Sequence, residues 1–356
     1  MNCCVECFSD NEIQSIIKTG IKGKCDLCNK HEVSVCDITK NESLKECFER
    51  LLEVYAPIKS KSLGSPSGNA DLLKNILANQ WSIFNLKPEE IYTFLINLLP
   101  EKYKEEPSLF NSPVEIKGNS QEDYLNENSI LGTSKWEDFV CEIKTTTRFH
   151  TTIINKEILE KILRHSCNKY NVGEVFYRAR IWSSKGGYDK CELGAPPEDK
   201  ATSGRANPEG IRCLYLADSI KTALHETRAG LHDLATVGTF ELTKEIDVVD
   251  LSSIDKLSPF NFYNIDILAA NLEHLNKIGN EISRPLRKHD SRLDYLPTQY
   301  ICDYIKSIGF DGIQYKSTMS TGGVNVAVFD ETKLSCVEAT DYDIHTISYK
   351  YKVNDD

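Results

Sequence analysis

The stretch that decides the fold of the second half of the chain is 204–226, GRANPEGIRCLYLADSIKTALHE. Its Gly, Asn and Pro residues predict an irregular loop with free backbone N–H groups. CLYLA then predicts a short strand and SIKTALHE the start of a helix. The loop carries Arg205, the strand Tyr215 and the helix Glu226. The residues three and four positions before Glu226 are small, so we expect this carboxylate to point inward, where it is costly unless it is paired or functional.

The sequence around this stretch predicts an α+β domain over 171–356, because short strands are interspersed with few helices. Strand signals, which are alternating or short apolar runs, occur at 174–182, 213–217, 235–242, 246–251, 312–317 and 323–329. Helical spacing of apolar residues occurs at 219–231, 263–279 and 298–309.

Residues 41–170 predict a mostly helical domain, since apolar residues recur there at spacings of three and four. The helical segments are 44–55, 70–81, 88–99 and 155–167. Between them, 60–69 predicts a small-residue loop and the polar stretch 117–129 a surface excursion.

Residues 1–40 contain two CxxC pairs, Cys4–Cys7 and Cys25–Cys28, separated by seventeen residues. Each CxxC turn supplies two thiolates, and two turns complete the tetrahedral set that zinc prefers. Four thiolates leave no open position for a substrate, so the spacing predicts a structural zinc ion. The alternative is a group of unpaired thiols near a frayed terminus. Other nearby residues that could replace a ligand are Cys3, His31 and Cys36.

Length, charge and composition exclude several classes of protein. The length of 356 residues favours two domains. The formal net charge of −11 argues against a generic nucleic-acid surface, which would be basic. No apolar run reaches the ~18 residues of a membrane span, and the N-terminus lacks a secretory signal. We therefore expect a cytoplasmic protein whose thirteen cysteines are reduced thiols or metal ligands.

Further motifs follow the opening stretch in order. FYRAR places Arg178 on an early strand, and 295–305, YLPTQYICDYI, forms a TQ-containing helix. The segment 309–329, GFDGIQYKSTMSTGGVNVAVF, contains Ser317 and Asn325. Together with the Arg, Tyr and Glu of 204–226, these pieces resemble the RES domain family. The N-terminal cysteine pairs and helices resemble the zinc-binding, HEPN-like region that precedes some RES domains.

The resemblance implies an ADP-ribosyltransferase-like fold that degrades NAD+ by cleaving the nicotinamide–ribose bond, by hydrolysis or phosphorolysis. It also implies a bacterial toxin or defence effector, with NAD+ as substrate and not as redox cofactor. Bond cleavage develops oxocarbenium character on the ribose, which a carboxylate near the 2′-hydroxyl stabilises. Catalytic roles are therefore expected for Glu226, Arg205, Tyr215 and Ser317. Substrate-binding roles are expected for Arg178, Asn325, Tyr315 and Asn207.

Each of these residues also has a structural interpretation. Arg178 would lie at a strand edge, Arg205 would pair with a surface carboxylate, and Tyr215 would fill the core. Glu226 would pair with Arg228 or Lys221, and Ser317 and Asn325 would be turn formers.

Other functions remain open at this stage. The same cleft would serve protein ADP-ribosylation, because the acceptor depends on its shape. A HEPN-type ribonuclease needs an R-x4–6-H motif, which 41–170 lacks; the one match, RPLRKH at 284–289, lies outside that region. A pure NAD+-binding module would not need the complete Arg, Tyr and Glu set, and no G-x-G-x-x-G supports a Rossmann site. Expected partners are an antitoxin or regulatory protein, or further copies of the chain.

Overall fold

The fold is described from a computed structural model. The described residues are 1–18, 20–58, 70–119, 121–182, 186–284 and 291–348. The predicted loop 60–69 and the part of RPLRKH that follows Arg284 lie outside these ranges. Among the residues inside them, no helix has the length and apolar character needed to cross a membrane.

The contacts between residues divide the chain into two compact units. Unit 1 comprises Met1–Phe139, Thr151–His165 and Asp255–Asn276, and unit 2 comprises Val140–His150, Ser166–Ile254 and Lys277–Asp356. These units group residues in space, whereas the sequence predicts three consecutive domains, 1–40, 41–170 and 171–356. Those three boundaries stay a prediction.

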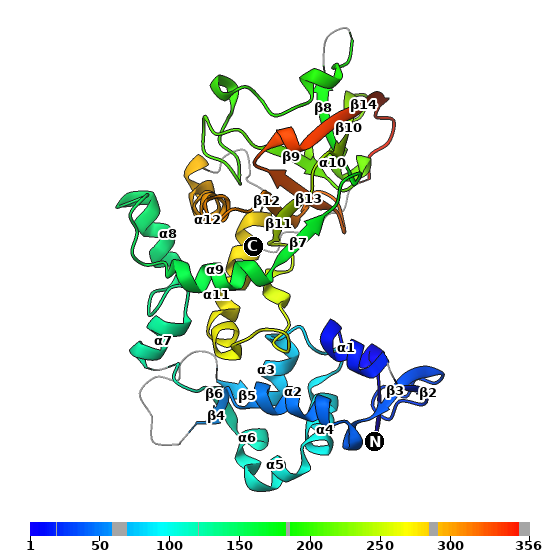
Figure 1. The fold of residues 1–356 in the computed structure, drawn as a ribbon, viewed down its shortest axis with the longest axis vertical. Coiled ribbons are helices and arrows are strands. Elements are labelled where there is room, and N and C mark those ends of the chain that lie inside the picture. Colours follow the sequence, from blue (N-terminus) through cyan, green and yellow to red (C-terminus); the bar gives the residue numbers. More distant parts are fainter. Residues whose placement is uncertain (19, 59–69, 120, 183–185, 285–290, 349–356) are drawn as a thin grey trace. The chain divides into compact units, whose positions relative to one another are not determined.

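Unit 2 contains a mixed sheet, which confirms the predicted α+β class (Figure 1). The eight strands found in the described residues have the order β14-β10-β8-β9-β13-β12-β11-β7. Only β11 and β12 pair in parallel; the other neighbours are antiparallel. The strands are β7 (Cys167–Tyr170), β8 (Val175–Trp182), β9 (Leu214–Ala217), β10 (Leu234–Leu242), β11 (Ile246–Asp250), β12 (Gly312–Lys316), β13 (Val324–Val328) and β14 (Leu334–Asp343).

Strand β9 and helix α10 (Ile220–Glu226) turn the opening stretch of sequence into a strand–helix unit. Leu214 and Leu216 are buried in the core on either side of Tyr215. The Ser219 hydroxyl accepts the N–H of Thr222 at 3.2 Å and caps the start of the helix. The helix was predicted to run to residue 231 but ends at Glu226. Just beyond it Arg228 has a φ of 55°, a left-handed conformation that does not continue a helix.

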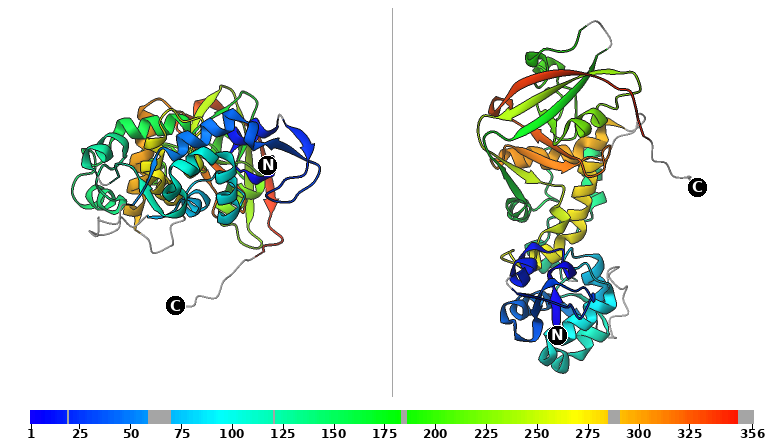
Figure 2. Two further views of the ribbon diagram at one scale, coloured as in Figure 1. Left: turned by 90° about the horizontal axis from the view of Figure 1, so that it is seen from below. Right: turned by 90° about the vertical axis from the view of Figure 1, so that its right-hand side faces the viewer.

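Two strands of the sheet were not predicted. β14 has the sequence LSCVEATDYD, and most of its residues are at least partly exposed because it forms one edge of the sheet. β7, CNKY, forms the other edge of the sheet. It begins at Cys167, which was predicted to be the last residue of the helix 155–167. Edge strands bury little apolar surface, so their apolar alternation is weak. In the right-hand view of Figure 2, β14 can be followed by its orange-red colour.

The other helices that contribute to unit 2 are α12 (Leu296–Ser307), the C-terminal part of α11 (Ile265–Ser283), and the C-terminal part of α8 (Trp136–Thr145). The remaining parts of α8 and α11 belong to unit 1. Buried Thr298 and Gln299 lie in the first turn of α12. This turn lies against the loop that carries Arg205, as the hydrogen bonds below show.

Unit 1 is mainly helical, as predicted, with two small antiparallel sheets in addition. Its further helices are α1 (Asn11–Lys18), α2 (Glu42–Leu52), α3 (Leu73–Asn79), α4 (Pro88–Leu98), α5 (Pro100–Glu105), α6 (Pro107–Asn111), α7 (Glu122–Asn128) and α9 (Lys156–His165). The sheets are β1 (Asn2–Cys4), β3 (Val33–Asp37) and β2 (Ile21–Gly23), and β4 (Tyr55–Pro57), β6 (Pro113–Ile116) and β5 (Asp71–Leu72).

The polar stretch 117–129 was predicted as an excursion, but it contains helix α7. Tyr124 fixes this helix, because its hydroxyl donates to Asp266 Oδ1 at 3.1 Å. The core of unit 1 includes a cluster of aromatic rings, in which Phe94 meets Phe8 and Phe48 at centroid distances of 5.4 and 5.1 Å.

Candidate functional site

Most of the predicted site residues line one cavity of about 360 Å³ in unit 2. Arg178, Arg205, Tyr215, Glu226, Tyr315 and Asn325 all line it. The predicted residues Ser317 and Asn207 are not among its described lining. Hence the side chains of three consecutive segments, the loop, strand β9 and helix α10, do share one cavity.

Glu226 is held in place by two hydrogen-bond donors, one just after strand β12 and one in strand β13. Ser317 Oγ donates to Glu226 Oε1 at 2.6 Å, and Asn325 Nδ2 donates to the same oxygen at 2.8 Å. Within the described part of the chain, the second oxygen, Oε2, accepts no hydrogen bond. Both donors are buried, at 9% and 3% exposed, so they fix the carboxylate from behind and leave one oxygen for the cavity.

The loop that carries Arg205 is fastened by helix α12. Gln299 Nε2 donates to Ser203 Oγ at 2.8 Å and to the carbonyls of Gly204 and Asn207 at 2.7 and 3.0 Å. Thr298 Oγ1 donates to the carbonyl of Arg205 at 2.9 Å. The TQ motif of the sequence therefore positions the loop backbone, a role that the sequence alone did not indicate.

The guanidinium of Arg205 has partners inside unit 2. Its Nη1 donates to the carbonyls of Ile282 and Ser283, both at 3.0 Å, near the C-terminal end of α11. Both carbonyls belong to the last turn of α11, where the negative end of the helix dipole lies. The guanidinium also lies 5.5 Å from the ring centre of Tyr315, a cation–π distance. Arg205 is thus oriented before any ligand binds, and it forms no ion pair with a carboxylate of the described residues.

Tyr215 joins the same loop through its hydroxyl. It donates to Asn207 Oδ1 at 2.6 Å and accepts the N–H of Ala206 at 3.0 Å. Burial raises the pKa of Tyr215 well above its usual value, so the phenol stays protonated and keeps its donor. A Cβ at Gly204 would lie 2.5 Å from this hydroxyl, so the glycine is needed for the loop to approach the ring.

Asn207 is only 4% exposed, and its Nδ2 donates to three loop carbonyls, those of Thr202, Pro208 and Ile211. In this arrangement Asn207 shapes the loop from inside. Its predicted contact with substrate would require this network to rearrange.

Arg178 approaches the cavity from β8. Its Nη1 donates to the carbonyl of Tyr215 at 3.3 Å. Burial, with a smaller effect from the neighbouring Arg180, lowers the pKa of Arg178 to about 10. A charge that burial destabilises would gain from an anionic partner, which is a feature of anion-binding sites.

Sequence reasoning missed several cavity residues. Arg228, Tyr177, Tyr295 and Met319 line the cavity as well. Tyr177 directly precedes Arg178 and Arg228 lies two residues after Glu226, so their closeness in sequence to predicted site residues was the available signal. Tyr295 and Met319 lie in matched motifs whose side-chain directions the sequence does not reveal.

The second candidate site is the group Cys4, Cys7, Cys25 and Cys28 in unit 1. All four sulfurs lie within 4.8 Å of one another. The Cys4–Cys7, Cys4–Cys28 and Cys7–Cys25 sulfur distances are 3.6, 3.5 and 3.6 Å. A tetrahedral zinc with Zn–S bonds of about 2.3 Å has sulfur–sulfur edges of about 3.8 Å. The four residues therefore fit a zinc ion closely.

The alternative ligands do not join this group. The His31 side chain is exposed, and Cys36 Sγ accepts a hydrogen bond from Asn41 Nδ2 at 3.2 Å. Cys3 is fully buried beside the four. A hydrogen bond from the Cys3 thiol, assisted by backbone N–H groups, lowers the pKa of Cys25 and favours the thiolate that a metal binds.

The comparison with known protein families identifies a domain in the C-terminal half of the chain. A family model described as the RES domain matches residues 176–351. This part of the chain, residues 176–351, is therefore a RES domain. Among solved structures, a chain of the M. tuberculosis MbcT–MbcA toxin–antitoxin complex is similar, at 17% identity and a TM-score of 0.35. The similarity covers 52% of this chain and 91% of that one. No curated protein matches the sequence.

Proposed function

We propose that the RES domain of this protein is an enzyme that cleaves the nicotinamide–ribose bond of NAD+. One observation carries the proposal: Glu226 is fixed through Oε1 by Ser317 and Asn325, while its Oε2 is left for a ligand in a cavity lined by arginines. Family membership and this geometry support the same chemistry independently.

The proposed mechanism depends on charge. As nicotinamide departs, positive charge develops on the ribose, and Glu226 Oε2 stabilises it while accepting the 2′-hydroxyl hydrogen bond. The bonding electrons leave with the ring nitrogen, which becomes neutral. Arg178, Arg205 and Arg228 supply positive charge to the cavity, which suits the diphosphate of NAD+. The rings of Tyr215 and Tyr315 offer flat surfaces against which nicotinamide can stack.

The acceptor of the ADP-ribosyl group defines the finer reaction. Water gives ADP-ribose and a proton, and inorganic phosphate gives a phosphorylated ADP-ribose. Transfer to a protein side chain is the alternative activity of the same cavity. These outcomes are separated by their products.

We also propose that Cys4, Cys7, Cys25 and Cys28 hold a structural zinc ion, since a closed four-thiolate set leaves no position for substrate. An enzyme that depletes NAD+ harms the cell that makes it, so we infer that an antitoxin or regulatory protein restrains it, as in a toxin–antitoxin pair. The HEPN-like interpretation of 41–170 and a role in defence stay predictions.

The test is nicotinamide release from NAD+ by the purified full chain, with and without inorganic phosphate. We expect Glu226→Gln to release nicotinamide at least about 10²-fold more slowly, because the charge opposite the transition state is lost. The matched control is Glu338→Gln, an exposed carboxylate on the edge strand, which should keep the wild-type rate. The proposal fails if the wild type releases no nicotinamide, or if Glu226→Gln is as active as the control.

A further inference from the structure

Two histidines and an aspartate of unit 2 lie close together, apart from both sites described above. They are His232, Asp343 and His345, and the atoms with which they could bind a metal ion all lie within 4.8 Å of one another. The distance from His345 Nε2 to Asp343 Oδ2 is 3.7 Å. All three residues are exposed, so water and ions can reach them. None of them belongs to the described lining of the cavity around Glu226.

The backbone brings the three residues together where β10 begins and β14 ends. The two strands pair in antiparallel fashion as far as Asp343, the last residue of β14. Beyond it, the N–H of His232 donates to the carbonyl of Ile344 at 2.8 Å, and the N–H of Ile344 donates to the carbonyl of Asp233 at 3.1 Å. Ile344 is thus held beside His232, with Asp343 before it in the chain and His345 after it.

The turn that carries His232 is fixed as well. The N–H of Asp233 donates to the carbonyl of Gly230 at 3.2 Å, and the N–H of Gly230 donates to Asp233 Oδ2 at 2.6 Å. Between them His232 has a φ of 65°, a left-handed conformation that costs free energy for a residue other than glycine. Strained residues of this kind are often found at ligand-binding sites.

The three side chains have little else to bind. Within the described residues, the ring of His232 forms no hydrogen bond, and the ion pair of Asp343 is with His345 and not with a Lys or Arg. An ion pair between Asp343 and His345 needs no third residue. The imidazole of His232 is therefore the group that distinguishes a metal site from a simple ion pair.

The ligand types select the metal. Zinc binds imidazole nitrogens and carboxylate oxygens at about 2.1 Å, so neighbouring ligand atoms of a tetrahedral site are about 3.4 Å apart. The observed 3.7 Å is close to this value, and small rotations of exposed side chains would bring all three atoms to it. Imidazole suits zinc, copper and nickel, whereas magnesium and calcium prefer oxygen ligands.

We propose that His232, Asp343 and His345 bind one divalent transition-metal ion of the zinc, nickel and copper class. The ion fastens the turn before β10 to the chain that leaves β14, and water completes its coordination. This site is separate from the cysteine group and from NAD+ cleavage, and it does not depend on the proposed function of the RES domain.

The test is isothermal titration calorimetry with zinc chloride on the full chain. The protein is made without a polyhistidine tag and is dialysed first, so that only tight sites such as the cysteine group keep zinc. We expect one further zinc ion per chain to bind with a Kd of about 10 µM or lower. Magnesium in about 100-fold excess should not displace it. Zinc should also raise the melting temperature, because an ion that binds only the folded chain stabilises it.

Three variants and a control locate the site, with circular dichroism to show that each is folded. His232→Gly removes one ligand, and glycine suits the left-handed backbone, so we expect the fold to be kept and the further zinc to bind at least about tenfold more weakly. Asp343→Asn and His345→Ala should weaken zinc binding to a similar degree. The matched control is His150→Ala, an exposed histidine of the same unit outside the group, which should bind zinc like the wild type.

The proposal is overturned if the wild type binds no further zinc at about 100 µM free zinc, a weak affinity. It is equally overturned if folded His232→Gly binds zinc like the wild type, if His150→Ala weakens binding as much as the three variants do, or if magnesium displaces the zinc. If His232→Gly does not fold, Asp343→Asn and His345→Ala decide the question by the same comparison with His150→Ala.

Discussion

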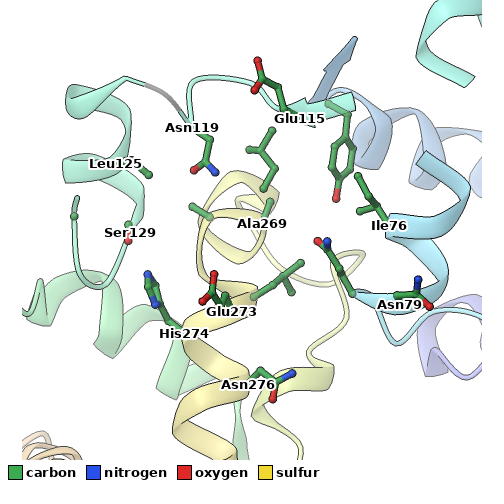
Figure 3. A pocket seen from close by; sticks show the side chains of 16 residues that line it. Ile76, Asn79, Glu115, Asn119, Leu125, Ser129, Ala269, Glu273, His274 and Asn276 are labelled. Atoms are coloured by element: carbon green, nitrogen blue, oxygen red, sulfur yellow. The ribbon is translucent and has the colours of Figure 1, made fainter. Parts of the chain in front are cut away.

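The RES cavity, which is the unit 2 cavity around Glu226, and a unit 1 cavity lined by α3, β6, α7 and α11 (Figure 3) have similar volumes, about 360 and 390 Å³, but different linings. Three arginines and one carboxylate line the RES cavity, whereas the described lining of the unit 1 cavity contains Glu115, Glu273 and His274 but no Arg or Lys. Size alone would allow the same ligand in both. The arginines distinguish the RES cavity, because they attract an anionic diphosphate.

The largest expected effect comes from the double variant Cys25→Ser, Cys28→Ser, which removes half of the zinc ligands. Zinc binding to such four-ligand sites is worth about 10 kcal/mol or more at neutral pH, and this free energy stabilises the folded state. We expect the protein to lose zinc by metal analysis and to show an early thermal transition.

The control for this variant is Cys36→Ser, which changes a cysteine of β3 that is not part of the four-sulfur group. It should retain zinc and unfold close to the wild-type temperature. A double variant that unfolds like the control, or a wild type without zinc, would show that the cysteine group does not stabilise unit 1.

The two cavities also differ in how far the sequence predicts them. Arg205, Tyr215 and Glu226 lie within one short stretch, so a strand and a helix of ordinary geometry bring them together, and their shared cavity was predictable. Glu115 and Glu273 come from distant segments, and neither lies in a motif. They line one cavity because of long-range packing, which the local periodicity of the sequence does not reveal.

A similar limit explains the errors within unit 2. The edge strands β7 and β14 were missed because exposed edges lack strong apolar alternation. The end of α10 depends on the left-handed Arg228, and nothing in the sequence marks an arginine for that conformation. Thr298 and Gln299 were recognised as a motif, but their role in holding the loop follows only from the contacts.

The variant Gln299→Leu tests that role and is expected to have the next largest effect. It leaves the carbonyls of Gly204 and Asn207 without this donor and frees the loop that orients Arg205. Each buried acceptor left unsatisfied costs about 1–3 kcal/mol. We expect the KM for NAD+ to rise about 30-fold, with a smaller change in kcat, because the loop carries Arg205, which we propose binds the substrate, and Glu226 is untouched.

The matched variant for Gln299→Leu lies in the other unit. Gln14→Leu removes an amide that donates to the carbonyl of Phe8 at 2.7 Å, so it should lower stability without changing the KM for NAD+. Equal KM values for the two variants would mean that Gln299 only stabilises the fold.

The smallest effect is expected for Ser317→Ala, which removes one of the two donors that hold Glu226 Oε1. Asn325 still donates at 2.8 Å, so the carboxylate is kept but is less well fixed. We expect kcat for NAD+ cleavage to fall about tenfold, the equivalent of about 1.4 kcal/mol, with KM little changed. Ser320→Ala is the control, since Ser320 is buried in the same loop and its hydroxyl accepts from Thr222, at 3.4 Å, without contacting Glu226.

The decisive measurement for Ser317 is the same substitution in the Glu226→Gln background. If Ser317 acts by positioning the carboxylate, its effect depends on that carboxylate, and the double variant should be hardly slower than Glu226→Gln alone. A full further tenfold loss would show that Ser317 acts on the substrate directly, for instance on the carboxamide of nicotinamide. Ser317 would then be a binding residue of the RES cavity, and Asn325 alone would be left to hold Glu226.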